Sequence, residues 1–364
     1  MAGGISPAAL GPEIPGAKPP QQPNSERYLH RRSDKILDPV PMQSLNQPNP
    51  AGRPKVIADG PLAHAVTDLM GDQLELLPWQ VAIDGSSEPV DGIYTYGHLL
   101  VDGAMLDRLP GVKVISNYGV GVDHIQVADA AERGIPVGNT PGILDGATAD
   151  MGFTLLLAAA RRVPEGDRYA HSPEFLRYDP GFMLGREVHG STLGIIGLGS
   201  IGRQVARRAR GFDMPVLYHN RRRREEAESD LGVRYASLDQ LLSESDYVMI
   251  CCPLTAETHH LINAAAFSKM KPSAILVNVA RGGIVDTDAL HQALKTGQIA
   301  AAALDVTDPE PLPRDHPILK LDNLTIVPHL GSATIETRQK MAEISVANLL
   351  AGLRGEPLLH QVQP

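Results

Sequence analysis

The sequence of 364 residues contains two cysteines, one tryptophan and only 4% aromatic residues. Cys251 and Cys252 are adjacent. Neighbouring residues of a strand point to opposite faces, so a disulfide between these two cysteines is not expected. This scarcity excludes a small scaffold held by disulfides and favours two buried thiols in a reducing compartment.

The sequence also lacks long hydrophobic runs and an excess of positive charge. The apolar stretch Thr154–Ala160 is followed at once by Arg161 and Arg162, whereas a membrane-spanning helix needs about 20 apolar residues. The formal net charge is −9, which gives no attraction for nucleic acid or anionic lipid. The N-terminus has the pattern of neither a secretory signal nor a transit peptide. We therefore expect a cytoplasmic protein that binds a small molecule, with no nucleic acid or membrane as a partner.

Residues 1–52 differ in composition from the rest of the chain. They are rich in Pro, Gln, Asn and Gly and contain only scattered hydrophobic residues. Such a segment cannot bury enough apolar surface to offset the entropy of ordering, so we expect a disordered tail. The remaining residues are numerous enough for two domains with full cores.

From Lys55 onward, short strand-like runs alternate with segments of helical length. This alternation predicts parallel sheets with helices on both faces. The apolar segment Ala147–Ala160 reads as a helix that links two α/β domains, and a last helix is expected over Ile335–Leu353. The expected strands are Val56–Ala58, Val112–Ile115, Leu193–Ile196, Val216–Tyr218, Tyr247–Cys251, Ala274–Asn278, Ala300–Leu304 and Leu324–Val327.

A glycine-rich turn follows the strand Leu193–Ile196 directly. In such a turn the first glycine permits a tight bend, the second lets a phosphate approach the backbone, and the third allows close helix packing. The N-terminus of the helix that follows, Arg203–Ala209, stabilises negative charge. The order of strand, turn and helix therefore predicts a dinucleotide site. The residues of the turn are Gly197, Leu198, Gly199, Ser200, Ile201 and Gly202.

The next strand ends in His219 and Asn220, followed by four arginines, Arg221–Arg224. NAD-preferring enzymes usually have an acid at this place to bind the ribose, and no acid is present here. Guanidinium groups match a phosphate with paired donors. We therefore expect NADP to be preferred, with Arg221 and Arg222 as phosphate ligands beside Asn220, while NAD stays possible. Part of the run would instead be solvated surface paired with the following glutamates.

Three polar residues, Arg281, Glu310 and His329, each follow a predicted strand. Ligands of open α/β sheets bind at the carboxyl ends of the strands. An arginine can hold a substrate carboxylate and polarise the adjacent carbonyl, and a histidine can deliver a proton to the forming alkoxide. A carboxylate beside the histidine would favour the imidazolium. These residues are the expected catalytic set for hydride transfer to a 2-oxo acid.

No metal site is expected. His259 and His260 lie near Glu257, but no cysteine set or ligand spacing accompanies them. Ser332 has no nucleophile-elbow context and suits hydrogen bonding better than covalent attack.

From about Lys55 to Glu356 the chain resembles the D-isomer-specific 2-hydroxyacid dehydrogenases, and within them the glyoxylate/hydroxypyruvate reductases, some of which are also called 2-ketogluconate reductases. The resemblance implies an α/β fold of two Rossmann-like, doubly wound parallel-sheet domains with the active site in the cleft between them. It implies a substrate domain of residues 53–156 plus 333–364 and a cofactor domain of residues 157–332. The segments that carry it are 194–202, 278–286, 304–312, 328–334 and 348–357.

The resemblance also assigns roles to single residues. Arg281 would bind substrate, Glu310 would orient the histidine, and His329 would be the acid/base. The backbone amides of Val120 and Gly121 would hold the substrate carboxylate, with Ser332 also at the substrate. Family members are usually dimers through the cofactor domain, so a homodimer is expected. Further positions that match residues lining the nicotinamide and its phosphates are Thr148, Pro253, Val279 and Asp305.

The segment Pro180–Leu184 departs from the more aromatic stretch of the reductases, so the preferred acid is left open. Our interpretation is NADPH-dependent reduction of small 2-oxo acids, glyoxylate or hydroxypyruvate, to glycolate or D-glycerate, with the proton from His329. One alternative is an NAD-linked dehydrogenase of another acid, such as 2-ketogluconate or a phosphoglycerate. A second alternative is a corepressor of the C-terminal-binding-protein type on the same scaffold.

Overall fold

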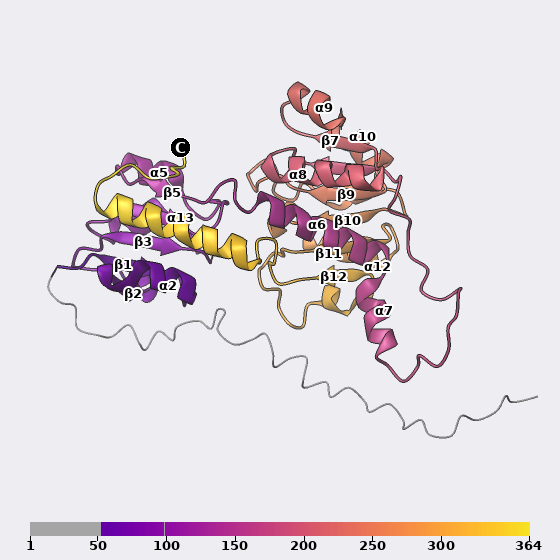
Figure 1. Ribbon diagram of the computed structural model, residues 1–364, viewed down its shortest axis with the longest axis horizontal. Coiled ribbons are helices and arrows are strands. Elements are labelled where there is room, and N and C mark those ends of the chain that lie inside the picture. The colour runs from indigo at the N-terminus through magenta and orange to yellow at the C-terminus, as the bar shows by residue number, and fades with distance from the viewer. Residues whose placement is uncertain (1–51, 98) are drawn as a thin grey trace, which may run out of the picture. The chain divides into compact units, whose positions relative to one another are not determined.

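The computed structural model describes residues 52–97 and 99–364 (Figure 1). The predicted disordered tail, residues 1–52, falls outside these residues except for Gly52. The described residues build two sheets, and every strand pairing in both sheets is parallel.

The first sheet has five strands in the order β2-β1-β3-β4-β5. The strands are β1 (Lys55–Ala58), β2 (Glu75–Pro78), β3 (Gly92–Thr95), β4 (Val114–Asn117) and β5 (Val137–Gly138). The helices between them are α2 (His64–Met70), α3 (Gln80–Asp84), α4 (Gly103–Asp107) and α5 (Val127–Glu132), with the 3-10 turn η2 (Gly71–Gln73). A last helix from the end of the chain, α13 (Ile335–Leu353), packs against α2 and β4.

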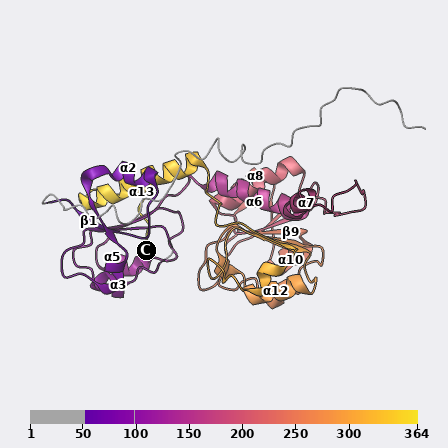
Figure 2. The same ribbon diagram turned by 90° about the horizontal axis from the view of Figure 1, so that it is seen from below.

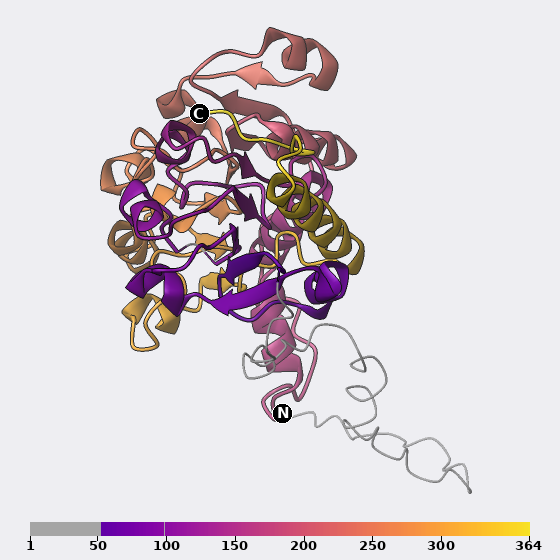
Figure 3. The same ribbon diagram turned by 90° about the vertical axis from the view of Figure 1, so that its left-hand side faces the viewer.

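Both faces of the first sheet are covered because its strands are apolar on both sides. Ile57, Ile93 and Ile115 point into the core shared with α3 and α5. Residues one position along, such as Val56 and Val114, point into the core shared with α2 and α13. Figure 2 shows these two helix layers on opposite faces, and Figure 3 shows the yellow helix α13 beside the indigo strands.

The second sheet has seven strands in the order β12-β11-β10-β9-β6-β7-β8. The first strand in sequence, β6, lies between β7 and β9, so the order of the strands reverses there. That reversal creates the crevice in which doubly wound sheets bind ligands. The strands are β6 (Leu193–Ile196), β7 (Val216–His219), β8 (Arg234–Tyr235), β9 (Tyr247–Ile250), β10 (Ile275–Asn278), β11 (Ala301–Leu304) and β12 (Leu324–Ile326).

Helices cover both faces of this sheet as well. On one face lie α6 (Asp145–Ala160) and α8 (Ser200–Ala209), and on the other lie α10 (Leu238–Glu244) and α12 (Thr287–Lys295) (Figure 2). The predicted linking helix is α6, which packs against α8, β10 and β11. The domain boundaries inferred from the resemblance stay a prediction. The remaining elements are α7 (Val163–Ala170), α9 (Glu225–Leu231), α11 (Ala264–Phe267), η3 (Arg210–Phe212), η4 (Gly282–Ile284) and η5 (Pro317–Lys320).

The predicted α/β class with two doubly wound parallel sheets is confirmed. All eight expected strands are present, with ends that differ by at most two residues, and α13 has the expected bounds. Four short strands, β2, β3, β5 and β8, were not expected. Within the described residues, no helix is long and apolar enough to cross a lipid bilayer.

Candidate functional site

The glycine turn after β6 has the geometry that a dinucleotide pyrophosphate requires. Gly197 has φ +100°, and a Cβ there would overlap the backbone nitrogen of Cys252. A Cβ on Gly202 would overlap the carbonyl oxygen of Gly197, so this glycine allows the helix to pack closely. Over Gly199, by contrast, no described atom lies within 4 Å of an added Cβ. This open space lies beside the N-terminus of α8, where backbone amides favour a phosphate, so the turn fits the cofactor.

Asn220, just after β7, supports that turn. Its side-chain oxygen accepts a hydrogen bond of 2.7 Å from the backbone nitrogen of Leu198. The side chain of Asn220 therefore joins the end of β7 to the phosphate-binding turn after β6.

The arginine run divides into paired and unpaired members. Arg223 donates two hydrogen bonds of 2.7 Å to Glu228. These bonds, with one from the Tyr218 hydroxyl, lower the pKa of Glu228 to about 2. Arg221 and Arg222 form no ion pair within the described part of the chain, and both are exposed. The two arginines expected at the cofactor phosphate are thus accessible to a ligand, while Arg223 is engaged in a surface ion pair with Glu228.

His329 and Glu310 form an ion pair at the carboxyl ends of β12 and β11. Nδ1 of His329 lies 2.8 Å from Oε1 of Glu310, and about a third of each side chain is exposed. The bond fixes the orientation of the imidazole ring because Nδ1 is engaged. The other ring nitrogen, Nε2, takes no part in this bond.

The loop that carries His329 is held by Asp305 at the end of β11. The carboxylate of Asp305 accepts hydrogen bonds from the backbone nitrogens of Leu330 (2.6 Å) and Gly331 (2.8 Å). His329 has φ +55°, a left-handed conformation that costs energy for a non-glycine residue. Burial raises the pKa of Asp305, and its bonds to the loop amides partly offset that rise. Asp305 therefore anchors the histidine loop.

Arg281 follows β10 and reaches a loop of the first sheet. Its Nε donates a 2.9 Å hydrogen bond to Oδ1 of Asp123. The guanidinium also lies against Gly121, where an added Cβ would overlap it. Within the described residues the backbone N–H groups of Val120 and Gly121 have no acceptor. An arginine and two available amides side by side have the donor groups that an anion such as a carboxylate requires.

One cavity of about 260 Å³ collects many of the expected residues. The expected residues that line it are Val120, Gly121, Thr148, Ile201, Val279, Arg281, Asp305, His329 and Ser332. Glu310 does not line the cavity itself, but it forms an ion pair with His329, which does. The expected residues that do not line it are Gly197, Leu198, Gly199, Ser200, Gly202, Asn220, Arg221, Arg222 and Pro253. The cavity therefore brings together residues expected at the substrate and at the nicotinamide, whereas the residues of the glycine turn other than Ile201 lie outside it.

Several cavity residues were not expected from the sequence. They are Tyr96, Asn117, Tyr118, Gly119, His124, Leu144, Gly331, Arg338 and Met341. The sequence could have indicated Asn117, because it is a polar residue at the carboxyl end of a buried strand. Its side chain donates hydrogen bonds to the carbonyl oxygens of Gly119 and Gly121. The sequence gives no indication that Arg338 and Met341 line the cavity, because their position depends on how α13 packs.

Away from this cavity, His259, His260 and Asp308 have ligand atoms that all lie within 4.8 Å of one another. All three residues are exposed, and the two imidazole rings are stacked with centroids 3.9 Å apart. The expectation that the chain holds no metal stays a prediction.

A doubly wound sheet with a glycine turn, beside a histidine–carboxylate pair and an arginine anion site, defines a nicotinamide-dependent dehydrogenase. Residues 153–331 match the family model described as the D-isomer specific 2-hydroxyacid dehydrogenase, NAD binding domain. The chain belongs to this family.

Similar proteins include glyoxylate reductases of known sequence. The one from Korarchaeum cryptofilum is 50% identical over 257 residues, which is 70% of this chain and 77% of that protein. The one from Pyrococcus furiosus is 42% identical over 315 residues, which is 84% of this chain and 94% of that protein. A solved structure of an NADPH-dependent glyoxylate/hydroxypyruvate reductase from Sinorhizobium meliloti, in complex with NADP and malonate, has a TM-score of 0.78 and 32% identity, and the match covers 85% of this chain and 97% of that one.

Proposed function

We propose that this protein is an NADPH-dependent reductase of small 2-oxo acids, with glyoxylate and hydroxypyruvate as substrates and glycolate and D-glycerate as products. Two observations support the proposal: the similarity of this chain to glyoxylate reductases, and the arginine and histidine that line one cavity. The same site would serve an NAD-linked enzyme for another 2-oxo acid, and the experiments below separate the two.

Each residue of the proposed site has a task that its position allows. Arg281 and the amides of Val120 and Gly121 bind the substrate carboxylate, and Arg281 polarises the adjacent carbonyl. His329 donates a proton from Nε2 to the carbonyl oxygen, and Glu310 holds the ring by Nδ1. When bound, NADPH supplies the hydride. The single observation that carries the proposal is the His329–Glu310 ion pair at the same cavity as Arg281.

The test is oxidation of NADPH and, in parallel, of NADH by the purified protein with glyoxylate, hydroxypyruvate, pyruvate and 2-ketogluconate, followed by absorbance. Turnover with glyoxylate and hydroxypyruvate supports the proposal. Turnover only with NADH and 2-ketogluconate favours the NAD-linked dehydrogenase of another acid. No turnover with any of the acids rejects the proposed enzyme function.

The preference for NADPH is proposed to depend on Arg221 and Arg222. Their joint replacement by alanine is expected to lower kcat/KM for NADPH by about tenfold to a hundredfold, because each loses a charge-assisted hydrogen bond to the 2′-phosphate. The value for NADH should change less than about threefold, since NADH lacks that phosphate. Steady-state kinetics with both cofactors measure this.

The matched control is Arg223→Ala, which removes a charge from the same run. Because Glu228 already engages Arg223, the ratio of NADPH to NADH efficiency should stay at the wild-type value. An equal change in that ratio for R223A and for the double variant would contradict the phosphate assignment.

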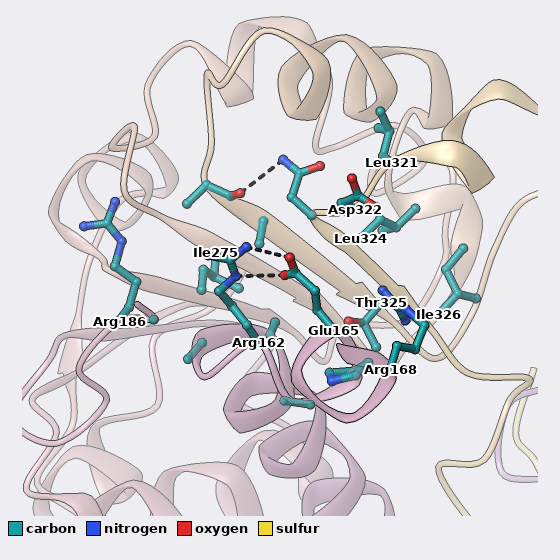
Figure 4. Close-up of a pocket in the computed structure, with 18 of the residues that line it drawn as sticks. Arg162, Glu165, Arg168, Arg186, Ile275, Leu321, Asp322, Leu324, Thr325 and Ile326 are labelled. Carbon is teal, nitrogen blue, oxygen red and sulfur yellow. Dashed lines mark hydrogen bonds and ion pairs between the residues drawn. The ribbon is translucent and has the colours of Figure 1, made fainter. Parts of the chain in front are cut away.

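We also propose a homodimer. After α7, a segment without helix or strand exposes large apolar side chains: Phe175, Leu176, Tyr178, Phe182 and Leu184. Exposed apolar patches of this kind mark association surfaces. Beside the segment lies a second cavity of about 490 Å³, whose lining residues include Ile275, Leu324 and Ile326 and the ion pair Arg162–Glu165 (Figure 4).

Replacing Leu176 and Tyr178 together by aspartate is expected to dissociate the dimer, because two charges would be buried in an apolar contact. Light scattering after size exclusion should then give the monomer mass of 39.0 kDa in place of twice that value. Leu359→Asp, a change at another exposed leucine, is the control and should leave the dimer intact. A wild-type protein that is monomeric at micromolar concentration would refute the dimer. The expectation of a cytoplasmic protein stays a prediction.

A further inference from the structure

The substrate cavity contains a second arginine that the proposed chemistry does not use. Arg338 lies in the first turn of α13, and its side chain lines the cavity together with Arg281. No carboxylate within the described residues forms an ion pair with it. Its guanidinium carbon lies 5.7 Å from the ring centroid of Tyr118, whose hydroxyl donates a 3.0 Å hydrogen bond to the Arg338 carbonyl.

Helix stability does not explain this arginine. The N-terminus of a helix carries a partial positive charge, so a cation in the first turn of α13 is unfavourable there. The helix already has a cap, because Thr334 accepts a hydrogen bond from the backbone nitrogen of Thr337. The Arg338 contact with Tyr118 is a weak cation–π interaction on the wall of the cavity. The charge is therefore available to a ligand.

The ligand chemistry follows from the shape of a 2-oxo acid, R–CO–COO⁻. Arg281 and the amides of Val120 and Gly121 take the carboxylate, and His329 takes the carbonyl oxygen. Only the R group is left for another part of the cavity. In glyoxylate R is a hydrogen atom and offers Arg338 nothing, whereas R carries a hydroxyl in hydroxypyruvate and can carry a second carboxylate.

We propose that Arg338 binds an oxygen on the R group of the substrate, and so determines the preference for 2-oxo acids that carry a hydroxyl or carboxylate on the third carbon. The inference rests on the proposed function for the orientation of the substrate. It assigns to this residue a part in specificity and none in the proton or hydride transfer.

Kinetics of Arg338→Gln test the assignment. The kcat/KM for hydroxypyruvate is expected to fall by about tenfold to a hundredfold through KM, because a charged hydrogen bond to substrate is lost. The kcat/KM for glyoxylate should change less than about threefold. Arg338→Lys keeps the charge and should retain part of the preference. The control is Lys340→Gln, which removes an exposed cation two residues further along α13 that does not line the cavity. It should leave kcat/KM unchanged for both substrates.

Calorimetric titration with malonate gives a readout that needs no turnover. Malonate has two carboxylates, one for Arg281 and one for Arg338, while acetate has one. R338Q should weaken malonate binding by about tenfold to a hundredfold and leave acetate binding unchanged. An equal loss of efficiency with hydroxypyruvate and glyoxylate, or unchanged malonate affinity, overturns the inference. Malonate binding that depends on Arg338 in a protein inactive on every 2-oxo acid supports the inference and rejects the proposed function.

Discussion

Replacing His329 by asparagine is expected to lower kcat by about a hundredfold to ten-thousandfold with glyoxylate, because general acid catalysis contributes factors of that size. Asparagine is the substitution to choose because it tolerates the left-handed backbone of this position better than other residues with a side chain. Affinity for NADPH should stay within about threefold of the wild type, since the phosphate-binding turn is separate from the histidine loop. Single-turnover kinetics and a fluorescence titration with NADPH measure the two quantities.

Glu310→Gln is the matched variant for this prediction. Glutamine can still accept a hydrogen bond from Nδ1 of His329, at the 2.8 Å separation that the pair has, but it removes the negative charge. The loss in kcat should therefore be smaller, about tenfold to a hundredfold. If H329N retained wild-type kcat, or if E310Q were more damaging than H329N, the assignment of the proton donor would be wrong.

The sequence predicted those parts of the molecule whose signal is local. The turn from Gly197 to Gly202 is one continuous segment between a strand and a helix, so its spacing alone indicates its geometry. Arg281, His329 and Glu310 each follow a strand of one parallel sheet. Because the carboxyl ends of such strands meet at one edge, the sequence alone predicts that these three residues lie close together.

Other features depend on long-range packing and gave no such signal. The resemblance places Asp305 at the cofactor, but it does not predict the hydrogen bonds that the Asp305 carboxylate accepts. Those bonds come from backbone amides of the loop after β12, and they depend on how that loop folds. Arg338 lies in a helix whose hydrophobic pattern was recognised, yet only the packing of α13 on the first sheet brings it to the cavity. The missed strands have two to four residues, too few for an alternating pattern to emerge.

Replacing Arg281 by glutamine is expected to lower kcat/KM for glyoxylate by about a hundredfold to a thousandfold, because both the charge on the substrate carboxylate and the polarisation of the carbonyl are lost. Unlike Arg338→Gln, this change should affect glyoxylate and hydroxypyruvate equally, since both carry the carboxylate. Steady-state kinetics with the two acids at saturating NADPH give the comparison. Malonate affinity should also fall, which calorimetry measures without turnover.

Asp123→Asn provides the control for the Arg281 prediction. Asp123 binds Nε of Arg281, so it either orients the guanidinium for substrate or merely competes with the substrate carboxylate. If it orients, D123N raises KM while R281Q and the double variant have the same activity, because the aspartate acts only through the arginine. If it competes, D123N lowers KM. Additive losses from R281Q and D123N would show that the Asp123 carboxylate acts on the substrate by a route other than Arg281, which would contradict both roles.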